Sequence, residues 1–257
     1  MIKLESTKVV GFEPTIRGMR NPMNSWEKSD TLFCDYDGDS YTINGDMAPI
    51  DSGFEGCGGE YYIVGPNDLD LMKRLAAGGP VHAKYRRMIV VYVDITAPLY
   101  WWKEFDTYKV GTVANSCSTM HKIHAKEFEL DDFSHEHIID FWGVTVKSLN
   151  MGKFDFDDQP IIVLGDGDHF VSPYGILKFT ISMLNRCREL YLETKDKKYW
   201  WQMIQLLPSS YNQKRTVMLN YEVLHNIYHS RKDHKLDEWH SFCDWIKELP
   251  YADEVIL

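Results

Sequence analysis

Apolar and polar residues alternate with two different periods along this chain, and the two periods predict both strands and helices. Residues 1–10 alternate weakly, which suits an edge strand. Met88 to Ile95 is rich in β-branched residues and predicts a buried strand. A cap at Asn67 predicts a helix within Gly65 to Leu75. Apolar residues recur at helical spacing from Pro173 to Leu192. The pattern therefore predicts a chain that mixes strands with long helices.

Three further segments are predicted to be helical. A short aromatic helix follows Pro98, which is a favourable residue at a helix start. Another helix is expected between Thr194 and Pro208. The C-terminal segment places apolar residues on one buried face: Leu236, Trp239, Phe242, Cys243 and Ile246. Around Asn44-Gly45 a hairpin is predicted, because this pair favours a tight turn.

The segment from Leu207 to Trp239 organises the rest of the chain. Pro208 and the polar residues after it predict a turn. From about Val217 the apolar residues recur at helical spacing, so a long helix is expected to follow. Asn220 opens one stripe of that helix and Arg231 closes it. Such a helix can present an amide and a guanidinium to a planar, anionic or carbonyl-bearing ligand; the alternative is an amphipathic helix with polar ends.

Two other stretches concentrate hydrogen-bond donors. The predicted turn carries three in a row, Gln213, Lys214 and Arg215. A predicted loop, residues 17–30, holds Arg17, Arg20 and Lys28 among asparagines and serines. A loop this rich in donors suits a phosphate or carboxylate site, and the alternative is a solvated loop.

Composition narrows the class of protein. With 257 residues, 44% of them hydrophobic, the chain is long enough for a substantial core in one large domain or two small ones. The net charge of −10 argues against binding of nucleic-acid polymers, although a local basic cluster can still bind a small phosphorylated ligand. The five cysteines form no CxxC pair, which favours a reducing compartment. Because neither a signal pattern nor a membrane-spanning run occurs, we expect a cytoplasmic protein without membrane contact.

The spacing from Leu207-Pro208 to Asn220 and on to Arg231 resembles the C-terminal signature of the flavin-dependent thymidylate synthases. In that family, polar residues of this helix contact the flavin, and the later arginine holds the pyrimidine of dUMP. The resemblance therefore implies that Asn220 and Asn226 bind FAD and that Arg231 is the catalytic residue. His82 and Ala97-Pro98 also match the family layout, so His82 is expected at the cofactor.

The hallmark of the family, Arg-His-Arg, seven residues and then Ser, is degenerate in this chain. Thr107, Tyr108 and Lys109 stand at the first three positions and Cys117 at the last. Only Lys109 keeps a charge, and the resemblance places it at the cofactor. The substrate-binding glutamine of the family is Glu104 here, its glutamate is Asn115 and its next arginine is Thr119.

Two explanations compete for these replacements. The site has either lost its function and left a scaffold, or its polar groups have been rebuilt for an altered ligand or chemistry. The replacements form a dense polar set, which favours rebuilding. The expected substrate-binding residues are then Arg17, Arg20, Glu104, Asn115, Ser116, Cys117, Thr119, Lys214 and Arg215.

The resemblance implies an α/β (α+β) fold, with a mostly antiparallel sheet and long helices. A single domain is expected over 1–257, with an elaborated insertion near 122–172, and a homotetramer with sites between subunits. The implied activity is FAD-dependent methylation of dUMP or a related modification of a pyrimidine deoxynucleotide, with NADPH and methylenetetrahydrofolate as candidate co-substrates. The alternative is a non-catalytic nucleotide-binding or assembly protein of the same fold that has lost flavin.

Two weaker signals point to other chemistry. Cys117 could act as a nucleophile beside His121 or Lys109, but a small buried residue in place of serine is preferred. Glu222, His225 and His229 share one side of the predicted helix at a spacing known from metal sites. One helix supplies too few ligands, so exposed histidines are preferred and no metal site is predicted.

Overall fold

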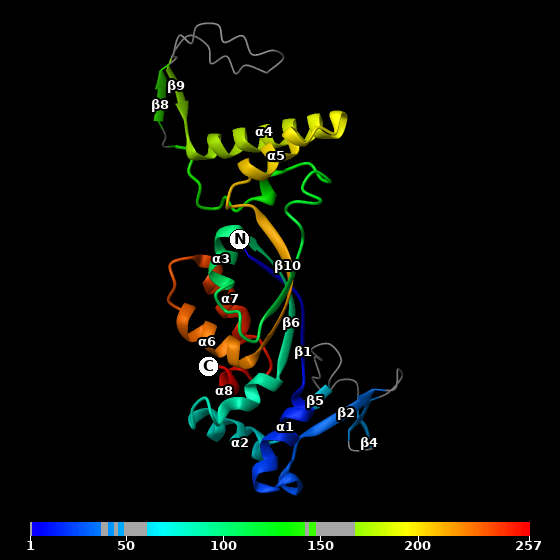
Figure 1. Ribbon diagram of the computed structural model, residues 1–257. Helices are drawn as coiled ribbons and strands as arrows, with labels where there is room; N and C mark the ends of the chain where they lie inside the picture. The colour runs from blue at the N-terminus through cyan, green and yellow to red at the C-terminus, as the bar shows by residue number, and fades with distance from the viewer. Residues whose placement is uncertain (1, 37–40, 44–45, 49–60, 142–143, 148–167) are drawn as a thin grey trace. The chain divides into compact units, whose positions relative to one another are not determined.

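The computed structural model describes residues 2–36, 41–43, 46–48, 61–141, 144–147 and 168–257 (Figure 1). They form two compact units. The first comprises Met1–Cys117 and Asn212–Leu257, and the second is Ser118–Tyr211. The expectation of one domain over 1–257 stays a prediction. Within the described ranges, no helix has the length and apolar character needed to cross a membrane.

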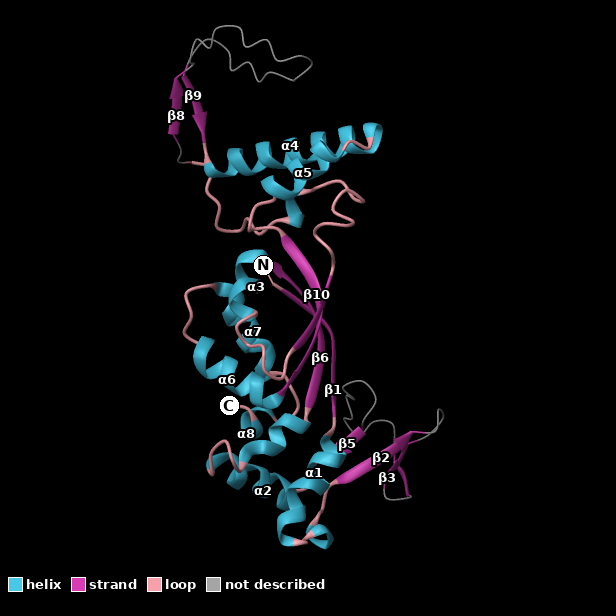
Figure 2. Cartoon of the chain, in the orientation of Figure 1, coloured by secondary structure: helices cyan, strands magenta, loops and turns pink. Residues whose placement is uncertain are grey.

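A four-stranded sheet forms the centre of the first unit, in the order β1-β6-β10-β7 (Figure 2). Its strands are β1 (Lys3–Val10), β6 (Val90–Pro98), β10 (Asn212–Asn220) and β7 (Val113–Ser116). Each neighbouring pair is antiparallel. The mixed fold with a mostly antiparallel sheet, which the sequence predicted, is therefore confirmed.

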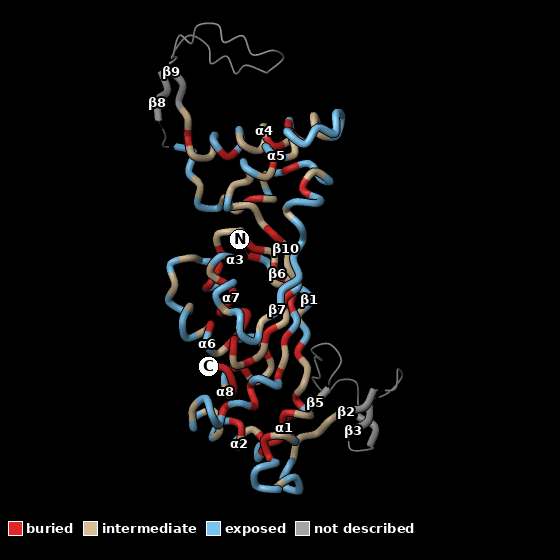
Figure 3. The backbone as a smooth tube through the Cα atoms, in the orientation of Figure 1, coloured by how far each residue is buried: buried red, intermediate tan, exposed pale blue. Residues whose placement is uncertain are grey.

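The helices α3 (Leu99–Phe105), α6 (Tyr221–Arg231) and α7 (Asp237–Lys247) gather along one side of this sheet (Figure 2). On β6, Val91, Val93 and Ile95 are buried while Tyr92 is exposed, so one strand face points to the core and the other to solvent. Buried residues continue along β10 and α7 (Figure 3). Burial of this apolar surface is the main contribution that holds the helices on the sheet.

The remaining elements of the first unit lie at one end of the sheet. They are α1 (Phe12–Arg20), α2 (Pro66–Ala77), α8 (Ala252–Val255) and a small antiparallel sheet of β2 (Leu32–Tyr36), β3 (Tyr41–Ile43), β4 (Asp46–Ala48) and β5 (Tyr61–Ile63). The strands β3 and β4 pair on either side of the predicted hairpin turn. The turn residues themselves, Asn44-Gly45, lie outside the described residues.

The second unit has its own core under two helices. These are α4 (Pro173–Thr194), which begins at the expected proline, and α5 (Lys197–Leu206). Phe128, Phe133, Leu184 and Met203 pack between the helices and the preceding loop. A two-stranded ladder of β8 (Val144–Lys147) and β9 (Asp168–Val171) completes the unit. The predicted insertion at 122–172 is part of it.

Two sequence predictions about elements are wrong. The segment Gln213–Arg215 is not a turn, and the helix does not start near Val217. Residues Asn212–Asn220 form β10, which is paired on both sides, and α6 begins only at Tyr221. Val217 and Leu219 are buried and alternate with less buried residues, which is typical of a strand. This alternation was missed in the sequence because the apolar residues that follow have helical spacing.

The second wrong prediction is the loop that was to begin at Arg17. Arg17 and Arg20 lie on α1, because Phe12, Ile16 and Met19 form a buried helical face that begins before them. Short 3₁₀ turns follow at Asn21–Met23 and Trp26–Lys28. The weakly alternating N-terminus does form an edge strand, β1, as predicted.

Candidate functional site

A cavity of about 210 Å³ lies where the loop after α3 meets α6. It is lined by Thr107, Tyr108, Lys109, Val110, Val223 and Asn226. Two of these, Lys109 and Asn226, are residues that the sequence predicted at a cofactor. Both side chains are exposed and bind no other described residue. The cavity therefore offers an ammonium and a carboxamide as free hydrogen-bonding groups.

Asn220 fixes the start of α6 beside this cavity. Its side-chain oxygen accepts the N–H of Val223 at 3.0 Å, which is an N-cap. Its amide nitrogen packs against Gly111, where an added Cβ would lie 2.8 Å from it. Gly111 has a φ of 81°, which favours glycine. Asn220 thus joins the helix start to the loop, and a direct contact of Asn220 with flavin stays a prediction.

Arg231 lies at the end of α6 and is held on several sides. Its Nε donates to the Tyr108 hydroxyl at 2.9 Å, and its Nη1 lies 3.2 Å from Glu104 Oε2. The guanidinium carbon lies 4.9 Å from the ring centre of Trp239 and 5.6 Å from that of Tyr108. Since Tyr108 also lines the cavity, Arg231 contacts one of the cavity walls.

Glu104 brings further groups to the same place. Its Oε2 accepts the indole N–H of Trp239 at 2.9 Å and lies 3.3 Å from His234 Nε2. One carboxylate oxygen therefore faces three donors, from Arg231, His234 and Trp239. The sequence placed Glu104, Tyr108 and Arg231 in one site but missed His234 and Trp239. Only the buried position predicted for Trp239 signalled that its indole N–H needs a partner.

The two basic residues predicted in the turn project from β10 instead. Arg215 Nη1 lies 2.8 Å from Asp106, its Nε donates to Gln213, and it stacks on Trp102 at 4.1 Å. Lys214 pairs with Asp94 at 3.2 Å and with Glu5 at 3.4 Å. A hydrogen bond from Thr216 and the contact with Lys214 lower the pKa of the Asp94 carboxyl. The charges of Lys214 and Arg215 are therefore compensated.

Asn115, Ser116 and Cys117 form an exposed row on and just after β7. The backbone of Cys117 is held by β10: its N–H donates to the Lys214 carbonyl at 2.9 Å, and its carbonyl accepts from Gln213 at 2.7 Å. The prediction that Cys117 is a small buried residue is wrong, because β7 is the outermost strand of the sheet. Thr119 and His121 belong to the second unit.

The two N-terminal arginines differ. Arg20 is buried, and its Nε donates to Asp68 at 2.6 Å. Burial alone would raise the pKa of the Asp68 carboxyl, but hydrogen bonds from Thr31, Ser29 and Arg20 together hold that pKa below its usual value. This ion pair fastens the C-terminal end of α1 to α2.

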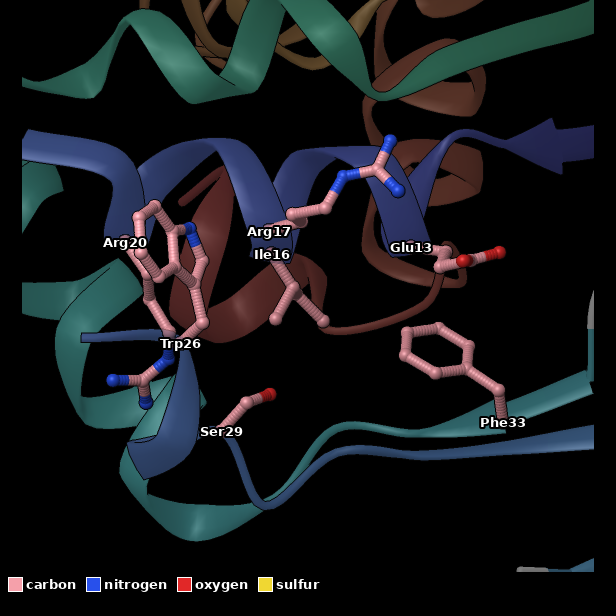
Figure 4. A pocket seen from close by; sticks show the side chains of 7 residues that line it. All are labelled: Glu13, Ile16, Arg17, Arg20, Trp26, Ser29 and Phe33. Carbon is pink, nitrogen blue, oxygen red and sulfur yellow. The ribbon is translucent and has the colours of Figure 1, made fainter. Parts of the chain in front are cut away.

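Arg17 borders a second cavity, of about 200 Å³, in the same region. It is exposed and has no partner among the residues that the structure describes. Trp26 and Phe33 flank this cavity on either side of Ile16 (Figure 4). The two cavities share no residue. Of the two predicted phosphate ligands, only Arg17 keeps an uncompensated guanidinium.

The histidines that the sequence analysis singled out do not line the cavity. His82 is exposed just before the 3₁₀ turn Ala83–Met88 and is not among the lining residues. His225 is half-buried rather than exposed, with its Nδ1 2.6 Å from the Ile256 carbonyl. Burial lowers the pKa of the His225 imidazole. The described part of the chain contains no group of three potential ligands able to hold a metal ion.

This arrangement of sheet and helices defines the class of fold: it is that of the flavin-dependent thymidylate synthases. Two of the similar solved structures are of thymidylate synthase X (ThyX) from Helicobacter pylori. One, with FAD and dUMP, superposes with a TM-score of 0.59 at 14% identity, over 100% of this chain and 97% of that chain. A second, also complexed with FAD and dUMP, gives a TM-score of 0.57 at 14% identity over 99% and 97%.

The sequence itself matches no known family model and no curated protein. The likeness is therefore one of fold, and the predicted resemblance is confirmed at that level.

Proposed function

We propose that this chain is a flavin-dependent enzyme that modifies a pyrimidine deoxynucleotide, by dUMP methylation or a related reaction. The observation that supports the proposal most is the cavity beside α6. It lies next to Arg231 in a fold whose solved examples contain FAD and dUMP. Lys109 and Asn226 line it, and Tyr108 links it to Arg231.

The free groups of the cavity fit part of a flavin. An ammonium and a carboxamide can bind the carbonyl oxygens of a planar ring or a phosphate. The start of α6 adds backbone N–H dipoles at the same place. At about 210 Å³ the cavity is smaller than the roughly 300–1,000 Å³ typical of small-molecule sites, so the described residues of one chain enclose only part of FAD. We therefore propose that a neighbouring copy in a homotetramer completes the site.

When bound, a flavin supplies the electron and hydride chemistry of the reaction. The role of the chain is to bind and orient. Tyr108 and Trp239 hold the plane of the Arg231 guanidinium, whose N–H groups stabilise charge that develops on a pyrimidine carbonyl. NADPH as reductant and methylenetetrahydrofolate as one-carbon donor belong to the same proposal.

The nucleotide phosphate is assigned to Arg17, whose charge is free. Because Arg17 lines a separate cavity, this role requires a neighbouring copy of the chain. Arg20, Lys214 and Arg215 are already paired, so they would contribute positioning rather than free charge. The exposed row Asn115 to Cys117, with Thr119, completes the proposed substrate-binding set, and His82 remains a proposed cofactor contact.

One observation favours the alternative, a nucleotide-binding or assembly protein of the same fold without flavin. The charge of Arg231 is neutralised by Glu104.

A visible spectrum separates the two functions. The purified chain is incubated with FAD and passed through gel filtration. Flavin absorption that co-elutes with the protein supports the enzyme, and colourless protein after this treatment supports the alternative.

A further inference from the structure

We infer that the carboxylate of Glu104 competes with ligands for Arg231. It occupies the guanidinium of Arg231 until a ligand oxygen displaces it. The identity of the ligand, a pyrimidine nucleotide, rests on the proposed function. The competition itself rests on the geometry of the two side chains. Glu104 would then set how tightly the nucleotide binds, because each binding event has to break an internal ion pair.

The contacts of Glu104 converge on one atom. Its Oε2 lies 3.2 Å from Arg231 Nη1, 2.9 Å from Trp239 Nε1 and 3.3 Å from His234 Nε2. A carboxylate that collects three donors at one oxygen occupies the position that a ligand oxygen would take on Arg231. The protein thus supplies an internal anion at its own arginine.

The pair is exposed enough to open. The side chain of Arg231 is 20% exposed and that of Glu104 is 37% exposed. An ion pair in contact with water is weak, because both charges are well solvated when they separate. Displaced from Arg231, the Glu104 carboxylate can turn toward water on its exposed side and still accept the indole N–H of buried Trp239 through one oxygen.

Arg231 stays in place when this pair opens. Its Nε remains bound to the Tyr108 hydroxyl, and its guanidinium remains over the indole of Trp239. These contacts do not involve the carboxylate. Tyr108 lines the cavity, so the arginine that Glu104 releases is already oriented beside the ligand.

Calorimetric titration of dUMP into wild-type protein and Glu104→Gln tests this inference. Glutamine keeps the length of the side chain and an oxygen for the Trp239 indole, but removes the negative charge. We expect dUMP to bind about fivefold more tightly to the variant, the effect of losing an exposed ion pair of about 1 kcal/mol. Unchanged or weaker binding would overturn the inference.

Glu189→Gln is the matched control. It makes the same substitution at a carboxylate that pairs with Arg186, at 3.1 Å, instead of Arg231. We expect its dUMP affinity to stay close to that of the wild type. An equal gain in both variants would mean that net charge, not competition at Arg231, controls binding, and this result also overturns the inference.

A ligand-free measurement keeps this inference separate from the proposed function. Phenylglyoxal modifies unpaired guanidinium groups, and peptide mass spectrometry gives the rate at each arginine. In Glu104→Gln, Arg231 should react several-fold faster than in the wild type, whereas Arg215, paired with Asp106, should not change. Equal rates at Arg231 overturn the competition. If dUMP binds to no variant but Arg231 reacts faster, the proposed function fails and the competition stands.

The wild-type chain alone gives a second test, which does not depend on the variant folding. At 1 M salt the screening length falls to about 3 Å, so a partly exposed ion pair weakens. Arg231 of the wild type should then react with phenylglyoxal several-fold faster in 1 M KCl than at low salt. A rate that is independent of salt contradicts an ion pair that opens readily.

Discussion

Arg231 is the residue on which the proposed chemistry depends, and its side chain is fixed before any ligand arrives. Arg231→Ala removes its charged hydrogen bonds, so dUMP should bind more weakly by roughly 1.5–3 kcal/mol. Isothermal calorimetry measures the change. Lys232→Ala, the exposed neighbour just after α6, is the control and should bind as the wild type does. Equal affinity of Arg231→Ala and wild type would remove Arg231 from the site.

Asp68 provides a test of stability at the same scale. Its folded-state pKa is depressed, so its contribution is fully present above the unfolded value of about 3.9 and is lost as pH falls through the folded pKa. Asp68→Asn leaves buried Arg20 without its counter-charge and should cost about 3–5 kcal/mol at pH 7. Urea unfolding at pH 7 and at pH 3 should show the difference shrinking at low pH. A difference that is constant with pH contradicts this assignment.

Several residues of the cavity were predictable from the sequence, whereas their partners were not. Lys109 and Asn226, which line the cavity, were predicted through spacing and resemblance, as was Arg231, which contacts the lining residue Tyr108. The contacts of Arg231 with Tyr108 and of Glu104 with Trp239 join residues more than one hundred positions apart. Such pairs depend on how α3, α6 and α7 pack together, which no local pattern encodes.

At the scale of elements, the junction between β10 and α6 escaped sequence analysis. Two periods meet there: alternation up to Leu219, and helical spacing from Tyr221 onward. The pairing of β10 with β6 and β7 decides the boundary, and pairing with distant strands overrides local preference. Strand β6 was easier to predict, because its β-branched residues continue through most of its length.

The loop that carries Gly111 gives the prediction for this scale. Gly111→Ala puts a side chain at a φ of 81° and a Cβ 2.8 Å from the Asn220 amide nitrogen. Gly79→Ala is the matched control, since its φ is 85° but nothing lies within 4 Å of the added Cβ. Both variants should lose about 1–2 kcal/mol from backbone strain. Gly111→Ala should lose more, as measured by urea unfolding, and equal losses would mean that the contact with Asn220 carries no constraint.

For the whole molecule, the fold persists although few residues are shared with its structural relatives. At 14% identity, the TM-score of 0.59 indicates a common fold built from largely different residues. Strands β1 and β6 and most of the helices were predictable because many different apolar residues satisfy the same periodicity. Strands β7 and β10 were not predicted. The division of the described residues into two compact units was not predicted, because it depends on how the segments pack in space.

The proposed sharing of sites between copies predicts an assembly. Sedimentation velocity should give a particle of four times the 30.0 kDa mass of the chain. The reason is that the described residues of one chain enclose a cavity of about 210 Å³ beside Arg231, which is too small for FAD. A monomer that nevertheless binds FAD tightly would contradict the shared site.

The most direct test of the proposed site is an equilibrium titration of FAD, followed by quenching of flavin fluorescence. The wild type is compared with the double variant Lys109→Met and Asn226→Leu, which removes both free polar groups of the cavity. Asn67→Leu, an exposed asparagine on α2, is the control. We predict at least about tenfold weaker FAD binding in the double variant, because one charged and one neutral hydrogen bond are lost. The control should bind FAD as the wild type does. FAD that binds equally to all three proteins would contradict the assignment of this cavity.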